Sequence, residues 1–131
     1  MNIFTRNSAQ NIWRKLLIAA TNNMSLPTNC SNNYGPYQHL EKAVPRFITS
    51  CILDEPVRVH GDGTAARDFI FVEDVCCAID TVMHSDINKI KGEVFNVASG
   101  VHRSILSIAK DVVGVMSKDE SIITFAGERP G

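Results

Sequence analysis

The sequence predicts an α/β fold in which helices pack on a small sheet, and two observations support this prediction. Segments with apolar residues at helical spacing alternate along the chain with short strand-like runs. In addition, 44% of the 131 residues are hydrophobic, so the chain can bury the core of one domain. Alternating helices and strands are typical of layered α/β structures. We therefore expect residues 1–131 to form a single domain.

The first part of the chain is predicted to hold two helices joined by a turn-rich loop. Residues 12–20 carry apolar side chains at helical spacing after two possible caps, which predicts a first helix that ends near residue 22. A second apolar stripe predicts a helix to about residue 53, with Pro45 in its first turn, where proline is tolerated. Between them the sequence SNNYGPYQ, residues 31–38, is predicted to be a loop.

Two strand-like segments and a helix follow. Residues 57–59 alternate apolar and polar side chains, as a half-buried strand does, and the pattern ends at a glycine turn. The apolar run at residues 69–72 is predicted to be a buried strand or an extended turn. Helical spacing then predicts a helix to residue 83, and Glu73 or Asp74 at its start would meet the positive end of the helix dipole.

The last third of the chain is predicted to form a strand, a helix and a final strand. Residues 94–97 and 122–125 are strand-like, and Ser104 is placed to cap the helix between them. The predicted inward face of this helix consists of Ile105, Ile108, Ala109, Val112 and Met116.

The composition narrows the possible partners. A formal net charge of −1 provides no basic field for nucleic acid or anionic lipid, so neither a nucleic acid nor a membrane is expected as a partner. The apolar run at residues 16–20 is too short for a signal sequence or a membrane span. The cysteines show no C-x-x-C spacing and the histidines are scattered, so we expect no metal site, reduced thiols and a cytoplasmic location.

Two arginines in predicted loops are candidates for binding phosphate. Arg67 follows the glycine turn and Arg129 precedes Pro130. Guanidinium groups at two such positions suit a diphosphate, because each can grip phosphate oxygens with two parallel hydrogen bonds. From the residues alone, the alternative is that both are solvated surface arginines.

Two further patterns lie near Arg67. Residues 61–66 match G-x-G-x-x-A, the form of a dinucleotide-binding fingerprint. A true fingerprint opens a helix, whereas the residues that follow are predicted to be extended, so we expect no cofactor at this turn. Asp68, Glu73 and Asp74 form an acidic group that is either an acid/base set or a structural turn and helix cap, and the structural alternative is favoured.

Three ordered motifs carry a resemblance to a known family. They read SNNYGPYQHLEKAVPRF, VHGDGTAARDFIFVEDV and GEVFNVASG. Together they resemble the C-terminal part of extended short-chain dehydrogenase/reductases, the NAD-dependent epimerases and dehydratases, and are most similar to dTDP-glucose 4,6-dehydratases. The resemblance covers residues 16–131. It implies a small substrate-binding domain whose Rossmann NAD-binding half is missing, with residues 1–27 a remnant of the last Rossmann-side helix and residues 28–131 the nucleotide-sugar-binding region.

The resemblance also implies a reaction and a set of binding residues. In full-length members bound NAD takes a hydride from C4 of the sugar, water leaves across C5 and C6, and the hydride returns. The implied ligand is a nucleoside-diphosphate sugar. Carried over motif by motif, the implied substrate-binding residues are Asn32, Lys42, Ala43, Arg58, Val59, His60, Arg67, Asn96 and Arg129.

The same comparison of motifs shows what the sequence lacks. Family members carry a catalytic Tyr-x-x-x-Lys, in which the lysine lowers the pKa of the tyrosine that transfers the proton. Counting back from the Leu26-Pro27 pair, the two positions hold Arg6 and Gln10, and neither can replace these groups. The glycine-rich NAD loop is also absent. We therefore assign no catalytic residue and expect this chain alone to bind no NAD.

Three kinds of function follow from this pattern. The first is an enzyme fragment of a dehydratase, an epimerase or a decarboxylase. Such a fragment would be either a truncated enzyme or one half of a split enzyme that a separate NAD-binding half complements. The second is a non-catalytic nucleotide-sugar binding module. The third is a structural or interaction segment that binds a partner chain through its exposed helix faces. Without a Rossmann sheet to cover them, the apolar helix faces would be partly bare, which favours self-association, including a homodimer.

Overall fold

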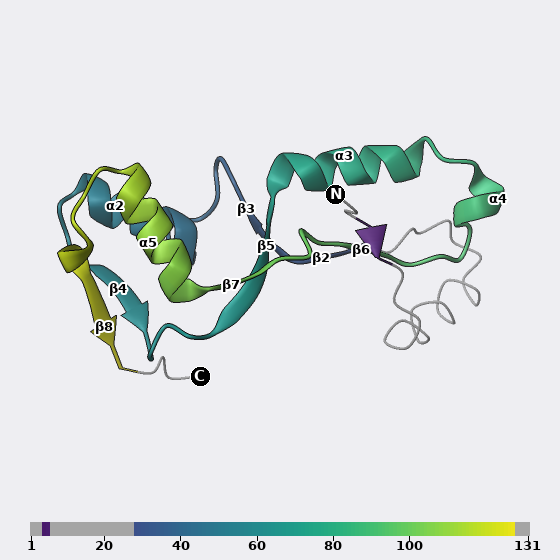
Figure 1. Ribbon diagram of the computed structural model, residues 1–131. Helices are drawn as coiled ribbons and strands as arrows, with labels where there is room; N and C mark the ends of the chain where they lie inside the picture. The colour runs from purple at the N-terminus through teal and green to yellow at the C-terminus, as the bar shows by residue number, and fades with distance from the viewer. Residues whose placement is uncertain (1–3, 6–27, 128–131) are drawn as a thin grey trace. The chain divides into compact units, whose positions relative to one another are not determined.

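The computed structural model describes residues 4–5 and 28–127, which divide into two compact units (Figure 1). Of the described residues, unit 1 comprises 4–5, 28–35 and 68–101, and unit 2 comprises 36–67 and 102–127. Buried apolar residues are found in both units, and the single domain expected for residues 1–131 stays a prediction. The predicted first helix, the positions of the missing catalytic pair and Arg129 lie outside the described residues.

Unit 1 contains a three-stranded sheet with the order β1-β6-β2. β6 (Phe95–Val97) is central, β1 (Phe4–Thr5) pairs with it antiparallel, and β2 (Thr28–Cys30) pairs with it parallel. The prediction of a strand at residues 94–97 is therefore confirmed to within one residue.

The prediction that residues 31–38 form a loop is wrong for their first half. Residues Asn32–Tyr34 form β3, which pairs parallel with β5 (Ala66–Phe71) in the register Asn32 to Phe69. The segment has no apolar alternation, so nothing local marks it as a strand. Its extended conformation comes from hydrogen bonding to a strand that lies more than thirty residues away in the sequence.

The helices of unit 1 follow β5 directly. α3 (Val72–Met83) carries Glu73 and Asp74 in its first turn, as predicted, and the short α4 (Ile87–Ile90) comes after it. α3 packs onto the strands through a buried apolar cluster of Ile70, Val75, Ala78 and Val97.

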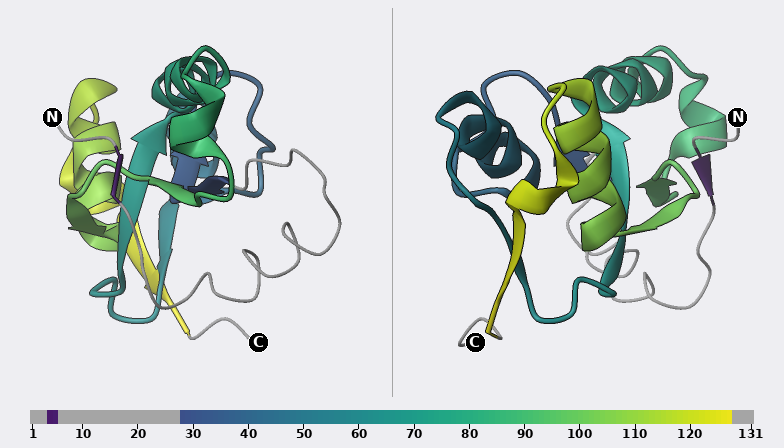
Figure 2. Two further views of the ribbon diagram at one scale, coloured as in Figure 1. Left: turned by 90° about the vertical axis from the view of Figure 1, so that its right-hand side faces the viewer. Right: turned by 60° about the vertical axis from the view of Figure 1, so that its left-hand side comes forward.

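Unit 2 is a two-stranded parallel sheet covered by two helices. β4 (Val57–His60) pairs with β8 (Ile123–Ala126), and α2 (Ala43–Ile52) and α5 (Ile105–Val115) pack against each other and against β4 (Figure 2). Short segments complete the unit, namely β7 (His102–Ser104) before α5 and a 3-10 turn, η1 (Glu120–Ile122), before β8. Its core is made of Phe47, Ser50, Cys51, Val57, Val59, Ile108, Ala109 and Val113.

The predicted helices and strands of unit 2 agree closely with the structure. The Oγ atom of Ser104 accepts a hydrogen bond from the Ser107 N–H at 3.0 Å, so the predicted cap of α5 is confirmed. Of the predicted inward face of α5, Ile108 and Ala109 are buried, and the other three residues are half-buried. No helix in the described part of the chain combines the length and apolar character needed to cross a bilayer.

A carboxylate joins three segments of unit 1. Asp68 Oδ1 accepts hydrogen bonds from Ser31 Oγ at 2.8 Å and from both the N–H and the Oγ of Ser99 at 3.0 Å, and Asp68 Oδ2 accepts one from the Gly100 N–H at 2.7 Å. Burial raises the pKa of Asp68, but these hydrogen bonds to the ionised form outweigh it, so the pKa lies below its usual value. The bonds favour the structural interpretation of Asp68.

Gly63 fixes the turn after β4 against α5. Its φ of +72° lies in the left-handed region, and a Cβ placed on it would lie 2.9 Å from both Leu106 Cβ and Val59 Cγ1. Its carbonyl oxygen accepts a hydrogen bond from the Leu106 N–H at 3.1 Å. Glycine is therefore required here both for its backbone conformation and for the close approach of the helix.

Replacing Asp68 by asparagine is expected to destabilise the protein by about 2 kcal/mol at neutral pH, because an amide offers one acceptor oxygen where the carboxylate offers two. Since the pKa is lowered in the folded state, the stabilisation from Asp68 is present above about pH 4 and is lost as the pH falls through the folded pKa. Chemical unfolding across this pH range should show a shallower acid-side decline for Asp68→Asn. Asp80→Asn, at an exposed carboxylate of α3, is the control and should change little; equal effects of the two variants would contradict the structural role.

Gly63→Ala is expected to destabilise the protein by about 2–4 kcal/mol, because the new methyl group adds overlap with Leu106 and Val59 to the strain of a positive φ. Gly61→Ala is a matched control, since Gly61 also has a positive φ, +62°, but a Cβ there meets nothing within 4 Å. It should cost only about 1 kcal/mol. Thermal unfolding of both variants measures the difference, and equal losses would show that the packing against α5 is unimportant.

Candidate functional site

A cavity of about 630 Å³ lies within unit 2. Its wall comes from the start of α2, the outer face of β4, the beginning of β5 and the first residue of α5. Most of the lining side chains are exposed to solvent, and Phe47 forms a buried apolar part of the wall. The lining residues are Glu41, Ala43, Arg46, Phe47, Arg58, His60, Ala65, Arg67 and Ile105.

The alternation of β4 decides which of its residues reach the cavity. Val57 and Val59 are fully buried, while Arg58 and His60 point to the opposite face and line the cavity. The Nδ1 atom of His60 also lies 3.4 Å from the Gly127 carbonyl oxygen. Of the three consecutive residues that the family resemblance implies, Val59 therefore has its side chain in the core rather than in the cavity.

The beginnings of two helices adjoin the cavity. Ala43 is the first residue of α2 and Ile105 is the first residue of α5. The N-terminal end of a helix carries a partial positive charge and favours anions. Lys42 stands at the N-cap of α2 without a side-chain hydrogen bond to the helix, and the first turn contains no acidic residue. α2 therefore contributes no negative charge of its own at this end.

The cavity wall is rich in guanidinium groups. Arg46, Arg58 and Arg67 line it together with a single carboxylate, Glu41. Within the described residues neither Arg46 nor Arg58 forms an ion pair, and the Arg67 guanidinium donates a hydrogen bond to the Ala66 carbonyl oxygen at 2.9 Å. Guanidinium groups that face a cavity without a carboxylate partner are suited to bind phosphate oxygens.

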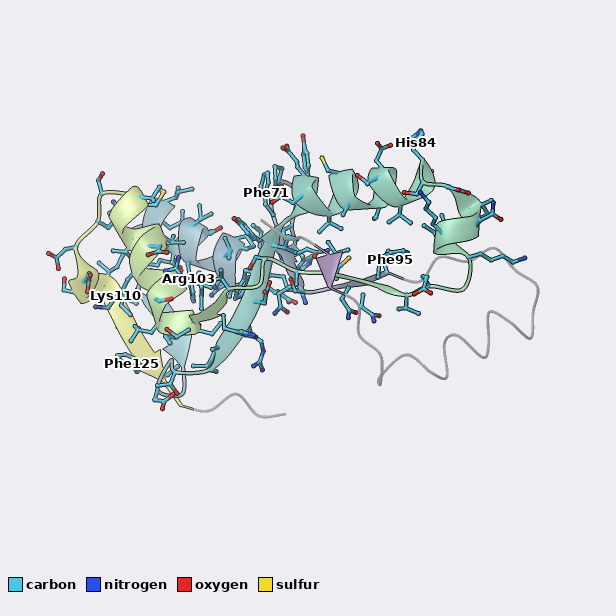
Figure 3. All side chains as sticks on the ribbon, turned by 45° about the vertical axis from the view of Figure 1, so that its right-hand side comes forward. Phe71, His84, Phe95, Arg103, Lys110 and Phe125 are labelled. Carbon is cyan, nitrogen blue, oxygen red and sulfur yellow. The ribbon has the colours of Figure 1, made fainter. Side chains whose placement is uncertain are left out.

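Three other cations of unit 2 are paired with carboxylates. Arg103 contacts Asp111 at 2.6 Å, Lys110 contacts Glu120 at 2.7 Å, and Lys118 pairs with a carboxylate of the α2–β4 loop. The side chains of Arg103 and Lys110 can be followed in Figure 3. These ion pairs satisfy the cations within the protein, which sets them apart from the cavity arginines.

The remaining implied residues lie outside this cavity. Asn32 and Asn96 belong to unit 1, where Asn32 Nδ2 donates to the Asp68 carbonyl oxygen at 3.2 Å and Asn96 Oδ1 accepts from Asn29 Nδ2 at 3.0 Å. The side chain of Lys42 is exposed at the start of α2, and Arg129 falls outside the described residues. The cavity thus brings together Ala43, Arg58, His60 and Arg67 from the implied set.

Two charged cavity residues, Glu41 and Arg46, are absent from the set implied by the sequence motifs. Arg46 lies three residues after Ala43, so both occupy the same face of α2. The apolar stripe is enough to predict this helix, whereas Arg46 is exposed on its polar face. Helical spacing from Ala43 would have been enough to place Arg46 beside it.

The glycine turn that resembles a dinucleotide fingerprint differs from a true fingerprint in the element that follows it. The turn leads into strand β5 instead of a helix, as expected, so the following helix whose N-terminus holds a pyrophosphate in a true fingerprint is not formed at this turn. Asp62 Oδ1 accepts hydrogen bonds from the Thr64 N–H at 2.9 Å and from its hydroxyl at 2.7 Å, and both lower the pKa of Asp62. The turn is therefore closed by its own side chains and by the contact of Gly63 with α5.

Comparison with known proteins places the chain in a family. The model of the NAD dependent epimerase/dehydratase family matches residues 16–98. Low-salt glycan biosynthesis protein Agl12 of Haloferax volcanii is 40% identical over 108 residues, which cover 82% of this chain and 34% of that protein. The dTDP-glucose 4,6-dehydratase of Xanthomonas campestris is 36% identical over 115 residues, which cover 81% and 32%. The chain thus spans about a third of the length of these relatives.

Solved structures show the same fold. The dTDP-glucose 4,6-dehydratase of Bacillus anthracis, in complex with NAD, matches with a TM-score of 0.81 and 27% identity over 95% of this chain and 41% of that one. A dTDP-glucose 4,6-dehydratase of Streptomyces venezuelae, with NAD and TYD bound, matches with a TM-score of 0.78 and 25% identity over 88% and 35%. The chain therefore belongs to the NAD-dependent epimerase/dehydratase family of extended short-chain dehydrogenase/reductases, with dTDP-glucose 4,6-dehydratases among its relatives, as its three motifs predict.

Proposed function

We propose that this chain is the nucleotide-sugar-binding part of an NAD-dependent nucleotide-sugar 4,6-dehydratase of the cytoplasm, and that it is inactive alone. The observation that carries the proposal is the cavity of unit 2, which Arg58, His60 and Arg67 line together. The relation to dTDP-glucose 4,6-dehydratases supports the dehydratase branch. The chain matches about a third of each curated relative, so the proposal concerns the nucleotide-sugar-binding part of the enzyme rather than the whole of it.

The cavity is suited to a nucleoside diphosphate. Arg67 would grip the phosphate oxygens, because its guanidinium offers several N–H donors in one plane. Arg58 and His60 lie on adjacent outward positions of β4, where a planar guanidinium and an imidazole would flank a nucleotide base. The partial positive charge at the start of α2 adds to the attraction for the diphosphate.

The sequence provides binding groups but not the expected proton-transfer pair. The residues four positions after the two tyrosines, Tyr34 and Tyr37, are Gln38 and Glu41 rather than lysine. NAD, when bound in a complete enzyme, supplies the hydride transfer of this chemistry. The role proposed for this chain is to hold and orient the nucleotide end of the sugar substrate.

Binding can be measured by calorimetric titration with dTDP-glucose and UDP-glucose. Arg67→Ala and Arg58→Ala are each expected to raise the Kd roughly tenfold or more, because a charge-assisted contact contributes about 1.5–3 kcal/mol. Arg103→Ala removes an equal charge from an ion pair outside the cavity and serves as the matched control. Absence of heat with the unchanged chain at millimolar ligand would overturn the proposal.

Turnover provides a separate test. The chain incubated with NAD and dTDP-glucose is expected to form no 4-keto-6-deoxy sugar, because no tyrosine here is followed by lysine at the required spacing. Addition of an NAD-binding half that carries Tyr-x-x-x-Lys should produce the 4-keto sugar, which is followed by chromatography. Product formation by the chain alone would contradict the proposed inactivity.

A further inference from the structure

We infer that Arg46 sets the affinity of the unit 2 cavity for a diphosphate by compensating the charge of Glu41. This inference rests on the proposed function and adds a specificity-determining residue that the family motifs do not imply. Both residues line the same cavity as Arg58 and Arg67. Arg46 therefore acts on the ligand in two ways. Its guanidinium can contact the phosphates, and its positive charge offsets the negative potential that Glu41 creates in the cavity.

The position of Arg46 is fixed by the packing of α2. The next residue, Phe47, is 3% exposed and anchors the helix in the core of unit 2, and Cys51, one turn further along, is fully buried. Arg46 itself is exposed and lies one turn after the start of the helix. Because the buried face holds the helix in one orientation, the Arg46 side chain is presented at the cavity with Ala43.

The charges of the cavity wall support a compensating role. Three guanidinium groups less one carboxylate leave a net charge of +2 when His60 is neutral. The diphosphate bridge of a nucleotide sugar carries one negative charge on each of its two phosphates, so the wall as it stands balances it. UDP and inorganic pyrophosphate carry more negative charge on their terminal phosphates and therefore depend at least as strongly on the positive charge of the wall. Without Arg46, Glu41 would cancel half of the charge of Arg58 and Arg67, and the wall would no longer match the ligand.

The contacts of Glu41 leave Arg46 available to a ligand. The Oε2 atom of Glu41 lies 3.8 Å from Nδ1 of His39, and the Glu41 N–H donates to the same nitrogen at 3.4 Å. No ion pair joins Glu41 to Arg46 among the residues that the structure describes. Glu41 therefore acts on the cavity through its field, and Arg46 keeps its hydrogen-bond donors for phosphate oxygens.

Four variants test this inference by titration with UDP and with inorganic pyrophosphate. Arg46→Gln is expected to raise the Kd of both probes roughly 5- to 20-fold, within the range of a partly exposed charge-assisted contact. Glu41→Gln should lower the Kd, and the double variant Glu41→Gln with Arg46→Gln should regain part of the affinity lost in Arg46→Gln, because it restores the net charge of the wall but not the donors of Arg46. Arg46→Lys should keep most of the affinity, because it keeps the charge. The differences in Kd between the variants should shrink above about 0.15 M salt, where charges are screened within roughly 8 Å.

Each outcome separates this inference from the function on which it rests. Arg103→Gln is the charge-matched control, and melting curves of all variants check that the fold is retained. If UDP binds and the Arg58 and Arg67 variants weaken it, while Arg46→Gln changes the Kd less than about twofold, only the role of Arg46 is overturned. If pyrophosphate binds with the expected dependence on Arg46 and a nucleotide adds nothing, the proposed function fails and the anion site stands. If neither probe binds, both are overturned.

Discussion

The burial of Val57 and Val59 under α2 and α5 is the constraint on which the candidate site depends. Successive side chains of a strand point to opposite faces, so burying these two valines turns Arg58 and His60 to the cavity. A shift of one residue in the pairing with β8 would place a guanidinium in an apolar core, which is far more costly than the loss of one valine contact. The packing of the two valines against α2 and α5 therefore determines which side chains of β4 line the cavity.

Local sequence patterns are sufficient for the main helices and strands of unit 2, although not for the short β7 and η1. The alternation at residues 57–59, the apolar stripe of α2 and the cap at Ser104 each depend on neighbouring residues, and each appears in the structure where it was predicted. β3 was missed because its polar sequence becomes a strand only by pairing with β5. The composition of each unit also depends on pairing between segments that lie far apart in the sequence.

The candidate site was predictable only in part. The motifs implied Ala43, Arg58, His60 and Arg67, which share one cavity, but motif matching does not distinguish a side chain that faces a ligand from one that faces the core, as Val59 does. The sequence favours a structural role for Asp68 but does not identify its partners, because the donors at Ser31 and Ser99 lie 37 and 31 residues away. An acidic residue beside an arginine has the same appearance in the sequence whether it transfers protons or holds a fold together.

The path of the chain has a consequence for synthesis on the ribosome. The chain passes between the units three times, after Gly35, after Arg67 and after Val101, so each unit is made of two separated stretches. Unit 1 cannot pair β2 until β6 has emerged, and unit 2 cannot pair β4 until β8 has emerged near the end of the chain. Unit 1 can therefore complete its strand pairing before unit 2, and the early strands of each unit remain unpaired and in need of protection until their later partners have emerged.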